Sequence, residues 1–142
     1  MATINLIRLA VGITDMNHLA QVQQERLFSF EGEPATETRT RNRPRRTEEL
    51  LNGGSLYWVI KNNIMLRQRV IGIEVAEDEA CRLILDPQLI RLAAVQKKAF
   101  QGWRYLKTSD APRDMGVFYP GTEGAGDMPA EMAEALKILG LS

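Results

Sequence analysis

Five arginines occur within nine residues of this chain, and their side chains are well suited to binding phosphate. The segment TRTRNRPRR, residues 38–46, carries Arg39, Arg41, Arg43, Arg45 and Arg46. In an extended chain alternate residues share a face, so the first three guanidiniums would follow one another at intervals of about 6.6 Å. A guanidinium is planar and permanently charged, and it can donate two hydrogen bonds to one phosphate. The segment therefore predicts a phosphate-binding strand, or else an edge strand that its charges keep soluble and unpaired.

A second pair of arginines, Arg67 and Arg69, lies inside the apolar run of residues 64–76. Apolar residues occupy even positions in the first half of this run and odd positions in the second half, so strict alternation cannot bury both sets. Either a bulge near Gln68–Val70 exchanges the two faces, or the arginines point into a cleft. A third alternative is that both side chains simply emerge at the end of a covered strand. We include both among the expected anion-binding residues.

Aromatic and basic side chains occur together in AFQGWRYL, residues 99–106. Such a combination can stack bases and hold phosphates. Trp103 and Arg104 are therefore expected on a recognition surface, and Tyr105 in a neighbouring cleft. The alternative is that these aromatic rings build the core, as most aromatic rings do.

Residues that could support catalysis are few. The chain has one histidine, His18, without cysteine or histidine neighbours at zinc-ligand spacing, so no metal site is expected. Cys81 lies on one strand face with two leucines, which predicts a buried thiol. Acid–base chemistry by Glu74 or Glu37 beside Lys61 stays open as an alternative, with Lys61 and Glu74 as further cleft residues. We expect no cofactor, and we favour binding over catalysis.

The composition is that of an ordinary globular chain. Its 142 residues fit one domain, and 44% of them are hydrophobic. The net charge is zero, but residues 1–107 carry 16 Lys and Arg against 12 Asp and Glu, whereas residues 108–142 carry 2 against 6. This asymmetry points to a charged partner. The single cysteine and the short, interrupted apolar start predict a cytoplasmic protein without membrane association.

The order of predicted elements indicates an α+β class. We expect helices over residues 15–29, capped by Thr14 or Asp15, and over 128–139, a short helix after Thr47 and a helical turn near Ser109 and Asp110. Strands are expected over residues 4–11, 36–43, 55–61, 64–76, 81–86 and 88–95, with a tight turn at Asn62–Asn63 and a loop over 116–128. Residues 1–142 would form one domain, with an α+β core over 1–107 and a C-terminal loop and docking helix over 108–142.

Four blocks of the sequence resemble a known family. RNRPRRTEELLNGGSLYWVIK, RQRVIGIE, LDP and AFQGWRYL are similar to the signature blocks of the bacterial domain-of-unknown-function family 1489, across roughly residues 3–115. This resemblance implies membership without implying an activity.

A second resemblance concerns the fold. GEPATETR, residues 32–39, followed by a short helix, Gly-Gly and a hydrophobic strand, is similar to ASCH domains, which belong to the PUA-like group of small β-barrels that commonly bind RNA. Gly32, Glu37 and Arg39 match the ASCH pattern, but Pro34 stands where that pattern has lysine. Because the lysine is implicated in catalysis in amidohydrolase members, the match implies binding rather than hydrolysis.

These observations together predict a small, mostly antiparallel, PUA-like β-barrel with flanking helices. An arginine-lined cleft would bind RNA or a nucleotide-containing ligand. The alternatives are a small hydrolase acting on a nucleoside- or amide-containing metabolite and a protein-interaction module. The expected binding residues are Arg39, Arg41, Arg43, Arg67, Arg69, Trp103 and Arg104.

Overall fold

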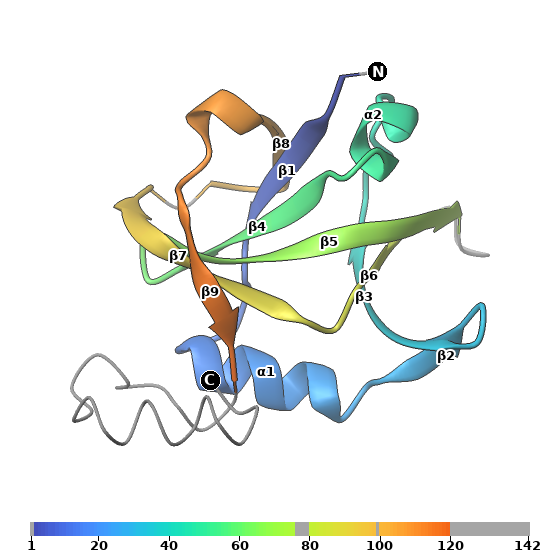
Figure 1. The fold of residues 1–142 in the computed structure, drawn as a ribbon, viewed down its shortest axis with the longest axis horizontal. Coiled ribbons are helices and arrows are strands. Elements are labelled where there is room, and N and C mark those ends of the chain that lie inside the picture. The colour runs from blue at the N-terminus through green and yellow to red at the C-terminus, as the bar shows by residue number, and fades with distance from the viewer. Residues whose placement is uncertain (1, 76–79, 99, 120–142) are drawn as a thin grey trace.

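Nine strands and two α-helices make up the described part of the chain, which a computed structural model gives as residues 2–75, 80–98 and 100–119 (Figure 1). The strands are β1 (Ile4–Leu9), β2 (Phe28–Phe30), β3 (Glu33–Thr40), β4 (Ser55–Ile60), β5 (Asn63–Val75), β6 (Cys81–Leu85), β7 (Leu89–Gln96), β8 (Trp103–Lys107) and β9 (Asp114–Phe118). The helices are α1 (Met16–Gln24) and α2 (Thr47–Leu51), and a 3₁₀ turn, η1, spans Thr108–Asp110. The α+β class and the helical turn are therefore confirmed.

The strands form one sheet in which the long strand β5 is central. The main order is β2-β3-β6-β5-β4-β1-β8, and β7 pairs with both β5 and β9. Strands β1 and β4 pair in parallel, and every other pair of described strands is antiparallel. The expectation of a mostly antiparallel sheet is confirmed.

Strand β4 is buried on both faces, as its unbroken apolar sequence predicts. Leu56, Trp58 and Ile60 belong to the main core. Tyr57 and Val59 belong to a second apolar cluster on the opposite face. The hairpin with β5 is confirmed, but the turn lies one residue earlier than expected, because Lys61 and Asn62 have φ of 49° and 64°.

Strand β5 contains the irregularity that its sequence implies. Its pairing with β6 shifts register between Val70 and Gly72, which confirms a bulge close to the expected position. Beyond the bulge, the odd-numbered Ile73 packs against the main core that Leu66 and Val70 enter from the first half. The bulge thus brings Ile73 of the second apolar phase to the main core, whereas Val75 of the same phase is exposed.

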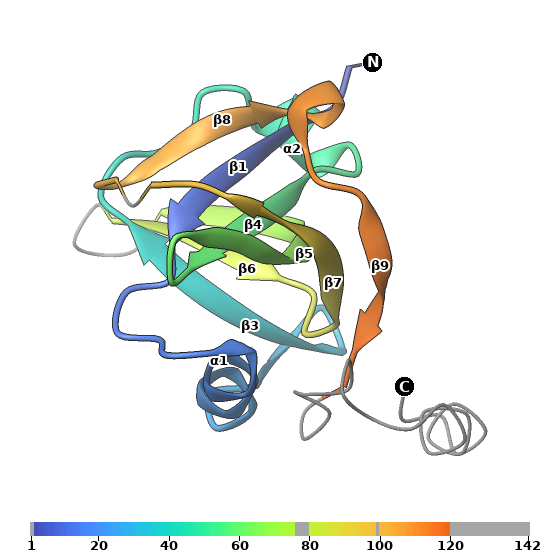
Figure 2. The same cartoon turned by 90° about the vertical axis from the view of Figure 1, so that its left-hand side faces the viewer.

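The hydrogen-bonded sheet curls strongly but does not close. Figure 2 shows the sheet wrapping round, with β8 at one side and β3 at the other, above α1. The ladder ends at β2 and β8, so a closed barrel is not formed by backbone pairing among the described strands. A side chain spans the gap instead: Arg8 Nη1 on β1 donates to Thr38 Oγ1 at 3.1 Å and to the Arg39 carbonyl at 2.9 Å, both on β3.

The expected bounds of α1 and of the C-terminal loop were also wrong. Helix α1 is capped by Asp15, whose side chain accepts from the His18 amide at 2.8 Å, but it ends at Gln24 instead of 29, and β2 follows. The loop was expected from residue 116, but residues 116–118 belong to strand β9, which pairs with β7 and carries the buried Phe118 into the core. The helix expected over 128–139 lies outside the described residues.

A fully buried glutamine joins α1 to the sheet. Gln68 Oε1 on β5 accepts from Gln23 Nε2 at 2.7 Å and from Trp58 Nε1 at 2.8 Å. Its Nε2 donates to Gln23 Oε1 at 2.8 Å and to the Asp86 carbonyl at 3.0 Å. Both the oxygen and the nitrogen of the Gln68 amide therefore make two hydrogen bonds, as burial requires. We call Gln23, Trp58 and Gln68 the amide–indole network.

Replacing Gln68 by leucine should destabilise the fold by roughly 2–4 kcal/mol, because it leaves the Trp58 and Gln23 donors buried without an acceptor. Urea unfolding measures this change. The matched control is Gln21→Leu on the exposed side of α1, which should change stability by less than about 0.5 kcal/mol. Equal stability of the two variants would show that the network does not stabilise the fold.

Candidate anion-binding site

The segment between β3 and α2, residues 41–46, forms what we call the arginine loop. Strand β3 ends at Thr40, whose Oγ1 donates to the Asn42 carbonyl at 2.9 Å as the chain turns. The expected extension to residue 43 was therefore wrong, and Arg41 and Arg43 do not continue the alternating row that Arg39 begins. The arginines are instead presented from an exposed loop.

Two aromatic side chains of β8 hold this loop in place. Trp103 Nε1 donates to the Asn42 carbonyl at 2.7 Å. The Tyr105 hydroxyl oxygen accepts from the backbone amides of Arg45 and Arg46 at 2.9 and 3.0 Å. The two rings pack edge to face with centroids 4.9 Å apart. Trp103 and Tyr105 thus meet the arginines as expected, but their polar groups fix the loop backbone.

Three guanidiniums of the arginine loop are without a described carboxylate at ion-pair distance: those of Arg41, Arg43 and Arg45. Arg46 is different, because it pairs with Glu49 and lies over the Tyr105 ring at 5.4 Å. The hydrogen bond between the Arg46 and Glu49 side chains raises the pKa of Arg46 and lowers the pKa of Glu49. The unpaired charge of the loop therefore lies on Arg41, Arg43 and Arg45.

Arg39 lies in β3, two residues before the arginine loop, and a nearby carboxylate partly neutralises its charge. Its Nε is 4.0 Å from Glu37 Oε1, and Glu37 also binds Arg82. Arg82 in turn donates to Glu74 at 2.8 Å, so the expected cleft residue Glu74 belongs to an ion-pair cluster along β3, β6 and β5. This cluster stabilises neighbouring strands, and Glu74 in it is held by a cation.

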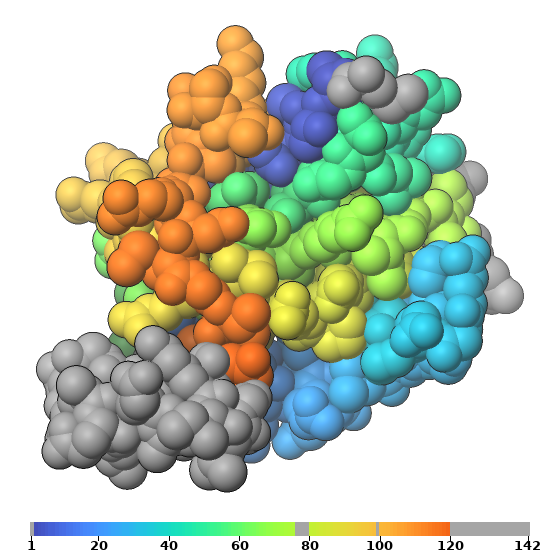
Figure 3. All heavy atoms as spheres, viewed as in Figure 1, coloured from blue at the N-terminus to red at the C-terminus, as the bar shows by residue number. Residues whose placement is uncertain are grey.

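Arg67 is placed apart from the arginine loop. Its Nε and Nη2 donate to the two carboxylate oxygens of Asp114 at 2.8 and 2.7 Å, and its Nη1 donates to Ser55 Oγ at 2.9 Å. Hydrogen bonding between the Arg67 and Asp114 side chains raises the pKa of Arg67 and lowers the pKa of Asp114. These residues line a hollow of about 420 Å³ between β1, β4 and the segment before β9, together with Arg113 (Figure 3). Arg67 therefore fastens β9 to the sheet.

The remaining expected residues also lie outside the loop. Arg69 is exposed on the same face of β5 as Arg67. Arg104 lies over the Phe100 ring at 4.4 Å and, by strand alternation, on the face of β8 opposite Trp103. Lys61 is exposed in the β4–β5 turn. The structure thus attaches the arginine loop to Trp103 and Tyr105 through Asn42, Arg45 and Arg46. It does not join the loop with Arg67 in one cleft.

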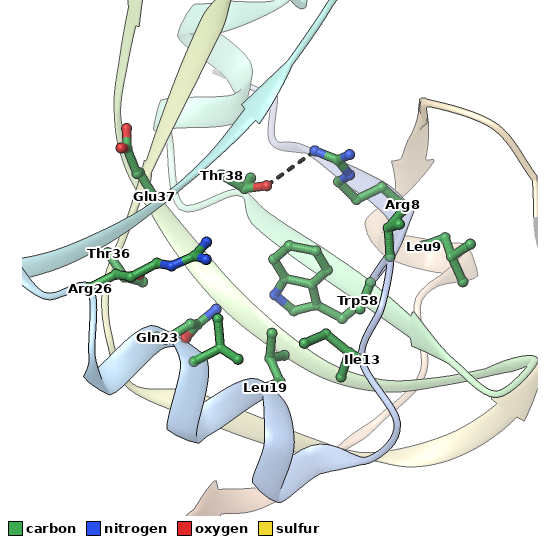
Figure 4. Close-up of a pocket in the computed structure, with 13 residues that line it drawn as sticks. Arg8, Leu9, Ile13, Leu19, Gln23, Arg26, Thr36, Glu37, Thr38 and Trp58 are labelled. Carbon is green, nitrogen blue, oxygen red and sulfur yellow. Dashed lines mark hydrogen bonds between the residues drawn. The ribbon is translucent and has the colours of Figure 1, made fainter.

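A pocket that the sequence did not reveal lies between α1, β1 and β3 (Figure 4). It has a volume of about 160 Å³. Its apolar wall is formed by Leu9, Ala10, Val11, Ile13, Leu19 and Val22, and its polar residues are Arg8, Gln23, Arg26, Thr36, Glu37, Thr38 and Trp58. The amide–indole network supplies Gln23 and Trp58, so part of the pocket wall is fixed by buried hydrogen bonds. We call it the Arg8 pocket.

Arg8 has an incomplete set of partners in this pocket. Its Nε is buried and has no hydrogen-bond partner in the structure, and the acceptors of its Nη1 are both neutral. Burial lowers the pKa of the Arg8 guanidinium. The signal in the sequence was a charged residue within the apolar run INLIRLAV, which an ordinary core strand does not contain.

Comparison with known families now defines the class of this chain. A family model described as "Protein of unknown function (DUF1489)" matches residues 6–142. The chain therefore belongs to this family, as the four sequence blocks indicated. Searches of curated proteins and of solved structures each found no match. No helix in residues 2–75, 80–98 or 100–119 is long and apolar enough to cross a membrane.

Replacing Tyr105 by phenylalanine should loosen the arginine loop, because the amides of Arg45 and Arg46 lose their acceptor. A hydrogen bond contributes about 1 kcal/mol, so exchange of these two amides with solvent deuterium should quicken about fivefold. Tyr57→Phe is the control, since Tyr57 lies in the second apolar cluster on another strand. Unchanged exchange in Tyr105→Phe would mean that the phenol does not hold the loop.

Proposed function

We propose that this protein binds single-stranded RNA, with the arginine loop contacting the phosphates. The supporting observation is that Trp103 and Tyr105 fix the loop backbone at three hydrogen bonds. A fixed loop presents its guanidiniums with less loss of conformational freedom on binding than a free one. Arginine is also the side chain whose geometry best matches phosphate oxygens.

The charge distribution supports a polyanion over a small neutral ligand. Arg41, Arg43 and Arg45 are exposed and lack described carboxylate partners, so their positive potential is directed to solvent. Several such charges close together release several counterions when a nucleic acid binds. A single small anion would engage fewer of them.

The curled sheet is compatible with a relationship to PUA-like domains. Gly32, which matches the ASCH pattern, has φ of 83° in the turn between β2 and β3. Glu37 and Arg39, the other matching residues, approach within 4.0 Å on β3. Arg82 also binds Glu37, so the matched residues take part in ion pairing between strands. They support a shared fold, and the proposal takes only binding, without hydrolysis, from that resemblance.

Replacing Arg41 and Arg43 by alanine should weaken binding of a short, unstructured RNA and flatten its salt dependence. For every phosphate that a missing guanidinium no longer neutralises, the log–log slope against salt should fall by about 0.7 for a single strand, hence by up to about 1.4 for the pair. Fluorescence anisotropy at several salt concentrations measures both the affinity and the slope.

The control is Arg113→Ala, which removes an exposed arginine beside the Arg67 hollow. Its affinity and salt slope should match those of the parent chain. If the double variant keeps the parent slope, or if Arg113→Ala lowers it equally, the arginine loop is not the RNA-binding surface.

A further inference from the structure

We infer that the Arg8 pocket receives a single nucleotide of the bound strand, with its phosphate held by Arg8 and Arg26 and its ring against the apolar wall. The inference rests on the proposed function, because it takes the ligand of the pocket to be part of the same RNA. It adds a second binding element to the arginine loop.

The charge of Arg8 is unmatched within the described residues. Partial burial removes water from a guanidinium, and a cation in such a place is normally compensated by an anion. None of the ion pairs within the described residues includes Arg8. Its buried Nε–H is left without an acceptor, although Nη1 has two. An oxyanion beside the guanidinium would compensate this charge.

Another cation converges on the same space. Figure 4 shows the Arg26 guanidinium, from just beyond the end of α1, directed towards the Trp58 ring, with Arg8 on the other side of that ring. Arg26 likewise forms no ion pair with a described carboxylate. Glu37, the acid at the rim, has its carboxylate turned away and bonded to Arg82. The pocket is therefore electropositive.

Few polar groups of the pocket remain available for a ligand. The Gln23 amide and the Trp58 indole are committed to the amide–indole network. Thr38 Oγ1 accepts from Arg8, which leaves its own proton free to be donated. Apart from the second N–H of Gln23 Nε2, the free donors come from arginine and threonine, a set that selects an anion such as phosphate.

The size of the pocket limits what can enter it. A volume of about 160 Å³ is below the roughly 300–1,000 Å³ of sites that enclose drug-sized molecules. Only part of one nucleotide can be enclosed, and the rest of the ligand must stay outside. Leu9, Ile13 and Leu19 supply an apolar surface for the ring.

Strand β3 connects the pocket to the arginine loop. Thr38 lines the pocket, and the next residue, Arg39, accepts a hydrogen bond from Arg8 through its carbonyl. The arginine loop starts two residues later. An RNA strand whose phosphates follow the loop would therefore pass the pocket, which makes the two features parts of one surface.

Isothermal titration calorimetry of the full chain with small probes tests the pocket separately from the arginine loop, because a single nucleotide is too short to follow the loop. The probes are a nucleoside 5′-monophosphate, its parent nucleoside and inorganic phosphate. The monophosphate should bind about tenfold or more tightly than either fragment, because only it engages both the guanidiniums and the apolar wall. Arg26→Gln should weaken its binding by about tenfold, the loss expected for one charge-assisted hydrogen bond.

Arg26 is exposed, so this variant should fold normally, and Glu25→Gln at the neighbouring exposed position is the matched control. Equal binding of inorganic phosphate and monophosphate, no binding of the monophosphate, or an Arg26→Gln variant that binds it like the parent would each overturn the inference.

The same variants separate this inference from the proposed function. RNA binding that responds to Arg41→Ala and Arg43→Ala but not to Arg26→Gln would overturn the pocket and leave the loop as the binding surface. Monophosphate binding that depends on Arg26, in a chain that binds no RNA, would support the pocket as a nucleotide site and overturn the proposed function.

Discussion

The buried amide of Gln68 is the contact on which the rest of the structure depends. It sits in the middle of the longest strand and binds both the helix α1, through Gln23, and the neighbouring strand β4, through Trp58. Because all three side chains are buried, breaking one contact leaves donors or acceptors unpaired, and the arrangement resists small shifts. This rigidity fixes the distance between α1 and the sheet. The Arg8 pocket is the space that results.

A sheet that curls without closing gives the protein its second structural constraint. A closed barrel would continue the backbone ladder beyond β8. This fold instead reaches β3 through the side chain of Arg8 on β1. The Arg8 guanidinium stabilises the contact between β1 and β3, but its Nε–H donor is buried without an acceptor. In our proposal, structural and binding roles therefore meet in one residue. Trp103 and Tyr105 on β8 anchor the arginine loop, which follows β3. The Arg8 pocket and the arginine loop therefore both depend on how β1 and β8 approach β3.

The sequence predicted the elements that a local pattern of residues determines. It did not predict the features that depend on contacts between residues far apart in the chain. The apolar run of β4 was sufficient to predict a hairpin, and the phase change in β5 gave the bulge as one of three alternatives. Strand β9 was missed because its glycine-containing sequence is typical of a loop, and pairing with β7 overrides it. Likewise, the spacing of the arginines gave no sign that Asp114 would pair with Arg67. The Arg8 pocket was missed because its lining comes from segments far apart in the chain.

Of the candidate site, the arginine-rich segment and the nearby aromatic residues could be proposed from composition alone. Their roles could not, since a ring that stacks a base and a ring that hydrogen-bonds a loop have the same sequence signature. The most direct test follows the arginine Nε–Hε resonances by NMR as a short single-stranded RNA is added. The account predicts that the signals of Arg8, Arg41 and Arg43 shift together while that of Arg67, held by Asp114, stays in place. Unchanged signals from Arg8 and the loop, at concentrations where RNA binds, would contradict it.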